Sequence, residues 1–202
     1  MIDLSLKSSR RFRRKAESHQ RIYEAAIRLF REQGFESTTV QDICDVADTA
    51  KQTFFNHFPG KDHILAEYHR RLVNDILQEI AELSSARHAE AILSAMRVFA
   101  AGVEKSESLS RTILRHVFSS DVLESNDRQN EQKIFRWFQN QVRLAIRNGE
   151  LAQGLNPLLL TSVVMCILSS TVQEWIGSSD FDLEKELVRR TRFVLQLSGG
   201  KR

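Results

Sequence analysis

The sequence predicts an all-α protein of about nine helices, with a small N-terminal three-helix domain followed by a larger helical bundle. Only 2 Pro and 8 Gly interrupt 202 residues, so few positions force a helix to end. Apolar residues recur at helical spacing along most of the chain. No alternating run of β-branched residues predicts a strand. These observations together favour long helices that each bury one face.

The first two helices have recognisable ends. Apolar residues at helical spacing predict a helix over about residues 14–33, and Gly34 follows it as a natural C-terminal cap. The second helix should begin near Thr39, because Thr39 and Asp42 have the spacing of a capping box.

A third, short helix is expected over about residues 51–57. A break at residues 48–50 separates it from the second helix, and the Pro-Gly pair at residues 59–60 stops it. Two short helices joined by a tight turn are typical of the helix-turn-helix, in which the second helix enters the major groove of DNA.

The rest of the chain also has helical spacing, beginning with a long helix at about residues 62–83. The further helices are expected near residues 88–104, 108–120, 126–148, 156–176 and 182–197. We therefore divide the chain into a basic N-terminal arm, a helix-turn-helix domain and a larger helical domain. Their expected ranges are residues 1–14, 15–62 and 63–202.

The net charge of +3 lies entirely in the first 61 residues, which hold 11 Lys and Arg against 8 Asp and Glu. Much of it belongs to the basic run over residues 7–15. Such a run is usually a solvated tail. Beside a DNA-reading domain it can also contact phosphates or the minor groove, and both interpretations stay open here.

The start of the third helix carries side chains suited to base edges. Gln52 can pair with adenine, Lys51 can meet guanine or phosphate, and Thr53 can touch a thymine methyl group or a phosphate. Replacing Gln52 with Ala should therefore weaken discrimination at one or two base pairs. Phe54 and Phe58 lie four residues apart, so both are expected to point inward.

The remaining predicted contacts are with the DNA backbone. Phe55 and His57 should point outward, Phe55 to pack on the sugar-phosphate chain and His57 to donate to a phosphate. Thr39 and Lys61 each stand at a helix start, where a hydroxyl or a positive charge can meet phosphate. A Lys61→Ala change should weaken binding evenly and flatten its salt dependence. The predicted DNA-binding residues are Thr39, Lys51, Gln52, Thr53, Phe55, His57 and Lys61.

Residues 15–66 resemble the TetR/AcrR family of bacterial transcriptional regulators. The resemblance is carried by Ala25-Ala26, Leu29-Phe30, Gly34-Phe35, Thr38-Thr39-Val40, Asp42-Ile43, Ala47, Thr53 to Phe58 and Lys61. It implies a dimeric, usually repressive regulator that binds a near-palindromic operator and releases it when a small ligand binds. The sequence departs from the family pattern at Asp48, where Gly is frequent, and at Ala50 and Gly60, where Ser is common. Cys44 takes a place often held by Ala, and a small buried side chain is expected there.

The last two helices, over about residues 157–197, are apolar on more than one face. Burial within one chain would explain this, but we favour a two-fold homodimer interface, which the family resemblance also implies. A charge at Val164 or Leu168 should then yield monomers.

The helices between about residues 88 and 148 hold an aromatic cluster, which is more often core than pocket. In the resembled family the corresponding helices enclose an effector, which for this chain is an unidentified small molecule. The polar residues that such a pocket could use are Arg97, Arg111, Arg115, His116 and Gln139. The sequence does not choose among them.

The function expected from these patterns is sequence-specific DNA binding in transcriptional regulation. No Gly-rich phosphate loop, paired-Cys metal spacing or nucleophile elbow occurs, so we expect no enzyme activity, cofactor or metal. Two alternatives stay open: a helical interaction or ligand-binding protein without sequence-specific DNA binding, and a small-molecule enzyme on a helical bundle. No run of about 20 apolar residues predicts a membrane span, and nothing marks export, so a cytoplasmic protein is expected.

Overall fold

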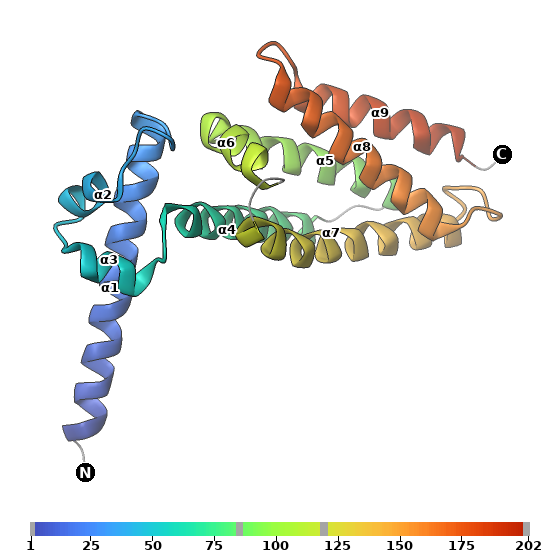
Figure 1. Cartoon of the computed structure of the whole chain (residues 1–202). Coiled ribbons are helices and arrows are strands. Elements are labelled where there is room, and N and C mark those ends of the chain that lie inside the picture. The colour runs from blue at the N-terminus through green and yellow to red at the C-terminus, as the bar shows by residue number, and fades with distance from the viewer. Residues whose placement is uncertain (1–2, 84–86, 118–120, 200–202) are drawn as a thin grey trace. The chain divides into compact units, whose positions relative to one another are not determined.

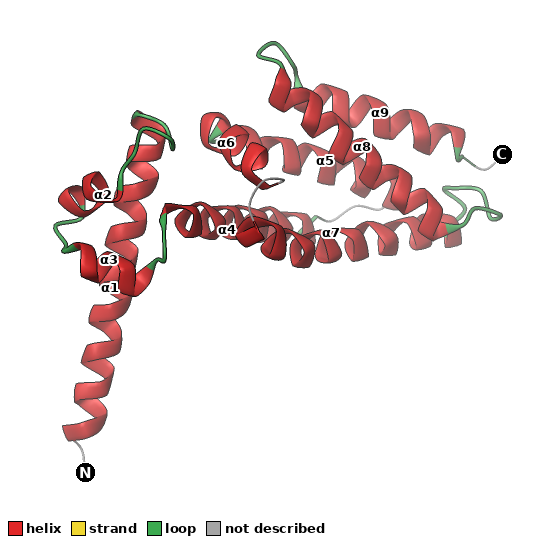
Figure 2. Cartoon of the chain, viewed as in Figure 1, coloured by secondary structure: helices red, strands yellow, loops and turns green. Residues whose placement is uncertain are grey.

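The computed structural model describes residues 3–83, 87–117 and 121–199, and the side chains of residues 12–83, 87–115 and 132–199. All regular secondary structure in these ranges is helical (Figure 2), which confirms the predicted all-α class. The helices are α1 (Asp3–Glu32), α2 (Val40–Val46), α3 (Lys51–His57), α4 (Lys61–Ala81), α5 (His88–Glu104), α6 (Glu107–Val117), α7 (Asp121–Arg147), α8 (Pro157–Gly177) and α9 (Leu183–Leu197) (Figure 1).

The chain forms two compact units, Met1–Tyr68 and His69–Arg202, and α4 runs across the boundary between them. In the first unit α1, α2, α3 and the first two turns of α4 surround a small apolar core. Its fully buried members come from all four helices: Ile22, Phe30, Ile43, Phe54, Phe58, Ile64 and Leu65.

The predicted end of the first helix and the predicted start of the second are confirmed. Gly34, just beyond α1, has φ of 87°, a left-handed conformation that favours Gly. The capping box of α2 is present, because Asp42 N–H donates to Thr39 Oγ1 over 3.1 Å and Thr39 N–H donates to Asp42 Oδ2 over 2.8 Å.

Helix α1 begins at Asp3, about eleven residues before the start predicted at residue 14. Residues 3–14 contain neither Pro nor Gly, and several are Leu, Lys or Arg, which are good helix formers. Since residues 3–14 continue α1, the helix start predicted at about residue 14 is wrong. Whether their basic side chains contact DNA stays a prediction, because the side chains of residues 3–11 lie outside the described part.

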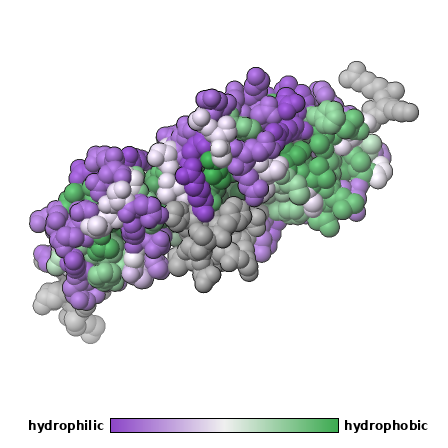
Figure 3. All heavy atoms as spheres, turned by 45° about the horizontal axis from the view of Figure 1, so that its top comes forward, coloured by the Kyte–Doolittle hydropathy of each residue, from purple (hydrophilic) through white to green (hydrophobic). Residues whose placement is uncertain are grey.

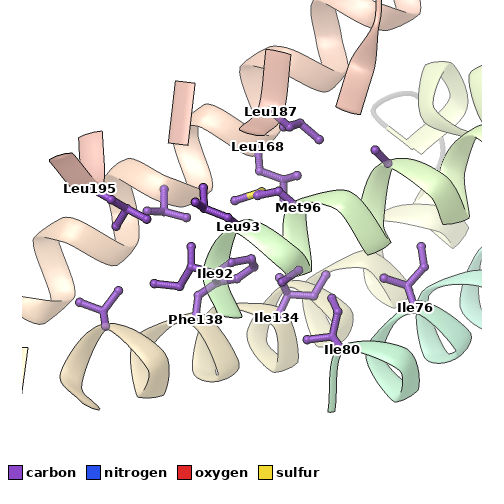
Figure 4. Packing of buried hydrophobic residues seen from close by; sticks show 14 of the residues in the cluster. Ile76, Ile80, Ile92, Leu93, Met96, Ile134, Phe138, Leu168, Leu187 and Leu195 are labelled. Carbon is purple, nitrogen blue, oxygen red and sulfur yellow. The ribbon is translucent and has the colours of Figure 1, made fainter. Parts of the chain in front are cut away.

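In the second unit α5 lies at the centre of the apolar core. Figure 4 shows Ile92, Leu93 and Met96 of α5 between α7 and the pair of helices α8 and α9. Helix α4 adds Ile76 and Ile80 to the same cluster. Much of the aromatic content predicted for this region joins this core, as Phe138 is 2% exposed.

Helix α4 meets α5 closely at Gly102. A Cβ atom added to Gly102 would lie 2.5 Å from Cγ1 and 2.7 Å from Cδ1 of Ile76. Real Cβ atoms do not approach other carbons so closely, so the absence of a side chain at this position lets the two helices touch.

Helix α8 has 21 residues and is long and apolar enough, by length and composition, to cross a membrane, which corrects the expectation that no run is. Its buried residues pack inside the second unit, with Val164 0% and Leu168 6% exposed. A core or interface helix of a soluble protein has the same composition. Asn156 caps the helix by accepting from the N–H groups of Leu158 and Leu159.

Candidate nucleic-acid interface

The turn between α2 and α3 is closed by backbone hydrogen bonds. Ala47 N–H donates to the Ile43 carbonyl over 2.9 Å, and Thr49 N–H donates to the Cys44 carbonyl over 3.0 Å. Between them Asp48 has φ of 46°, in the left-handed region that Asp tolerates better than most residues. The tight turn therefore forms with Asp48 at its left-handed position.

Helix α3 is anchored by Phe54 and Phe58, which are 0% and 2% exposed, so their predicted inward orientation is confirmed. Their ring centroids lie 6.1 Å apart, and the ring of His19 on α1 lies 4.5 Å from that of Phe58. This packing fixes which face of α3 points away from the first unit.

The predicted DNA contacts on α3 fall on its outer side and flanks. Lys51 and Gln52 are exposed, and the Phe55 side chain is 50% exposed. Thr53 and His57 are half-buried. The structure thus brings five of the seven predicted residues together within two turns of one helix, while Thr39 and Lys61 stand at the starts of α2 and α4.

Thr39 has fewer free groups for a DNA phosphate than the sequence predicts. Its N–H is already donated to Asp42, and its hydroxyl oxygen accepts the Asp42 N–H. Hydrogen bonds to the Asp42 carboxyl from the Thr39 N–H and the Thr39 side chain hold the pKa of this carboxyl below its ordinary value. A bond from the Thr39 hydroxyl to a phosphate would therefore replace its bond to the Asp42 carboxyl.

Lys61 has structural partners that the sequence did not reveal. Its ammonium donates to the carbonyl oxygens of Phe35 at 2.8 Å and Thr38 at 3.1 Å, with Glu36 at 3.4 Å. The same Nζ lies 4.3 Å from the centre of the Phe35 ring. The side chain therefore ties the start of α4 to the loop before α2, whereas its predicted bond to phosphate stays a prediction.

A small group of titratable side chains supports the end of α3. His19 Nε2 lies 3.3 Å from Glu67 Oε2 on α4, and the rings of His19 and His57 are 5.7 Å apart. Burial lowers the pKa of His57, and the positive charges of His19 and Lys15 lower it further. His57 is therefore mostly neutral near pH 7 and can donate one N–H.

One exposed residue of α3 was missed by the sequence analysis. Asn56 lies one turn after Gln52, and Gln52 Nε2 donates to Asn56 Oδ1 over 3.4 Å. The helical period that assigned Phe54 and Phe58 to the core would also have placed Asn56 on the opposite face.

The first unit offers little for metal or thiol chemistry. Among the described residues no group of three or more His, Cys, Asp or Glu is arranged to hold a metal ion. Cys44 is buried, as predicted, and burial raises the pKa of its thiol. A protonated, buried thiol is a poor nucleophile.

Comparison with known proteins gives consistent matches. Residues 22–68 match the family described as "Bacterial regulatory proteins, tetR family". The uncharacterised HTH-type transcriptional regulator YvdT of Bacillus subtilis is 19% identical, over 87% of this chain and 91% of its own. The HTH-type transcriptional regulator AcrR of Shigella flexneri is 31% identical, over 59% of this chain and 48% of its own.

Solved structures share the fold. FadR of Thermus thermophilus, described as a TetR family transcriptional repressor in complex with lauroyl-CoA, has a TM-score of 0.70 at 22% identity, over 91% of this chain and 96% of its own. A TetR transcription regulator from Haloarcula marismortui has a TM-score of 0.76 at 14% identity, over 91% of this chain and 98% of its own. The small N-terminal domain and the helical bundle that follows it in the chain are therefore found together in other proteins.

Proposed function

Because the chain belongs, through residues 22–68, to the TetR/AcrR family of bacterial transcriptional regulators, we propose that it binds a near-palindromic DNA operator as a homodimer and releases it when a small molecule binds. One observation carries the proposal: α3 is anchored by Phe54 and Phe58 and directs Lys51 and Gln52 outward. We propose that the protein acts in the cytoplasm, without catalytic activity or cofactor.

The proposed DNA contacts divide by chemistry. In the first turn of α3, Gln52 reads a base edge in the major groove, and Lys51 and Thr53 each meet a base edge or a phosphate. Phe55 and His57, on the flanks of the same helix, meet the backbone together with the hydroxyl of Thr39. The backbone contacts set the orientation of α3, and the base contacts supply sequence preference.

The proposed homodimer interface consists of apolar side chains of the second unit that are exposed to solvent in the single chain. Apolar surface gathers on this unit near the C-terminus (Figure 3). The most exposed apolar residues of α8 and α9 are Leu158 at 51%, Leu159 at 65%, Val163 at 44%, Phe193 at 62% and Leu197 at 72%. A two-fold partner that covers this surface removes it from water.

The buried side of α8 corrects one part of the sequence analysis. Val164 and Leu168 were expected to lie at the interface, but they are 0% and 6% exposed within their own unit. A charge there would disrupt folding rather than separate two copies. Val163 and Leu159, on the outer face of α8, are the positions that test the interface.

For the effector we propose a groove of about 290 Å³ lined by Gln132, Phe135 and Arg136 of α7 and Met165 of α8. Apolar walls with a few polar groups are typical of small-molecule sites. Two structural relatives hold organic molecules, lauroyl-CoA in Thermus thermophilus FadR and choline in a regulator from Saccharomonospora viridis.

The arginines that the sequence offered for the effector are engaged elsewhere. Arg97 Nη1 lies 3.2 Å from Glu90 Oε1. The Arg111 guanidinium lies 4.1 Å from the ring centre of Trp175 and donates to the Trp175 carbonyl. Arg115 donates to the Ile176 carbonyl over 3.4 Å, Gln139 is half-buried, and the side chain of His116 lies outside the described part.

The proposal is tested by binding to DNA from upstream of the chain's own gene, with a scrambled duplex as competitor. We expect salt-sensitive binding and a preference for the upstream DNA of about 10³-fold or more. Gln52→Ala should reduce this preference, whereas Gln78→Ala, which removes an exposed amide of the second unit, should not. Equal affinity for both duplexes at moderate salt would contradict a specific regulator and favour a helical interaction protein.

A further inference from the structure

The residues of α3 that lie farthest from the core are Gln52 and Asn56. Each residue of an α-helix is turned by about 100° from the one before it, as 3.6 residues make a turn. Phe54 and Phe58 are buried, so the opposite direction falls on Asn56, with Gln52 about 40° away, and both residues are exposed. Thr53, Phe55 and His57 point toward the two flanks.

A hydrogen bond links these two outermost side chains. Gln52 Nε2 donates to Asn56 Oδ1 over 3.4 Å, between residues one turn apart. The bond sets the orientation of both amides. Gln52 keeps its Oε1 acceptor and one N–H, which complement the N6–H donor and the N7 acceptor of adenine, and Asn56 keeps both N–H groups of Nδ2.

We propose that Asn56 is a specificity-determining residue that donates to a keto oxygen or purine N7 in the major groove, beside the base that Gln52 reads. This inference rests on the proposed DNA-binding function. When a helix lies in the groove, its outermost side chains face the floor, where base edges are exposed, and its flanks face the phosphates. Guanine offers O6 and N7 to an amide donor, and thymine offers O4.

The spacing of the two residues fixes where the second base lies. Four residues of helix advance by about 6 Å, and base pairs are stacked about 3.4 Å apart. Asn56 therefore reaches a base pair one or two steps from the one that Gln52 contacts. Because Asn56 orients the Gln52 amide, loss of Asn56 should also lower base discrimination at the position that Gln52 reads.

The test is selection of bound duplexes from a random-sequence pool by the full-length wild-type protein and its Asn56→Ala, Gln52→Ala and Gln78→Ala variants. Gln78→Ala is the matched control, because Gln78 also donates to the residue one turn later, Glu82, but lies in the second unit. Thermal unfolding checks that each variant folds, which the exposure of Asn56 favours.

We expect Asn56→Ala to lower base discrimination about fivefold or more at a position one or two base pairs from the Gln52-dependent one. A base preference identical to that of the wild type would overturn the inference, and so would a uniform loss of affinity. The proposed function fails separately, if the wild-type protein itself enriches no sequence.

Discussion

The ammonium of Lys61 lies 2.8 Å from the carbonyl oxygen of Phe35 and 4.3 Å from the centre of its ring. The two residues are 26 positions apart, so this contact joins the start of α4 to the end of the α1–α2 loop. The loop leads directly to Thr39, the cap of α2. The position of α4 is thereby linked to the helix that supports α3.

Lys61→Met should lower the stability of the first unit, by about 1–2 kcal/mol, because it removes charge-assisted hydrogen bonds from partly buried carbonyls. Because three carbonyl oxygens already accept from its ammonium, its loss should flatten the salt dependence of DNA binding less than the sequence alone predicts. Lys51→Met is the matched control, since Lys51 is exposed at the start of α3. It should leave stability unchanged and reduce the salt slope by about one unit. Thermal unfolding and salt-dependent anisotropy measure the two effects, and the opposite assignment would restore Lys61 as a phosphate contact.

DNA affinity should rise as the pH falls from 8 towards 5.5, through the range in which histidine ordinarily takes up a proton. Burial lowers the pKa of His57 in the free protein, and the charges of His19 and Lys15 lower it further. The carboxylate of Glu67 on α4 lies 3.3 Å from His19 Nε2. A phosphate favours the charged imidazolium, so binding takes up a proton where free His57 is neutral. Affinities measured between pH 8 and pH 5.5 should show this rise in the wild type and a smaller one in His57→Gln. An equal rise in affinity in the wild type and in His57→Gln would mean that another group takes up the proton.

Gly102→Ala should destabilise the second unit by about 1–3 kcal/mol, because the new Cβ would lie 2.5 Å from Ile76 Cγ1. Ile76→Ala alone leaves a cavity and is destabilising as well. The double variant should lose less stability than the sum of the two, because truncation of Ile76 frees the space that the added methyl group needs. Urea unfolding gives the three values. Additive losses would mean that α4 and α5 do not constrain each other at this contact.

Val163→Glu should convert the proposed dimer to a folded monomer, measured by light scattering with size-exclusion chromatography. The Val163 side chain is 44% exposed, so a charge there costs little within one chain but is buried in the interface. Val164→Glu is the control and should unfold the second unit, because Val164 is fully buried. A bismaleimide at the exposed Cys166 can report whether two copies meet, as Cys44 is buried. A dimer that survives both Val163→Glu and Phe193→Glu would move the interface elsewhere.

Local patterns predicted much of the fold and of the site. The Thr39–Asp42 capping box, the left-handed Gly34 and the inward Phe54 and Phe58 all follow from residues within one or two turns of one another. The helical period also places Asn56 on the face opposite Phe54 and Phe58, so its exposure could have been predicted from the sequence. These features depend on neighbours in sequence, so the sequence specifies them.

Features that depend on tertiary contacts could not be predicted in the same way. The partners of Lys61 lie more than 20 residues away, and nothing local distinguishes it from a phosphate contact. Likewise, α8 is apolar on several faces, and only the packing of the second unit shows that Val164 faces inward and Val163 outward. The start of α1 at Asp3 was missed because charge, rather than helix propensity, guided the assignment of the basic run.

The most direct test of the central claim is the sequence that the wild-type protein enriches from a pool of random duplexes at physiological salt. A dimeric regulator with one α3 per copy should enrich an inverted repeat whose half-sites are centred about one turn of DNA (~34 Å), or a multiple of it, apart. Enrichment of no motif, or of a single unrepeated half-site, would contradict a two-fold DNA-binding regulator.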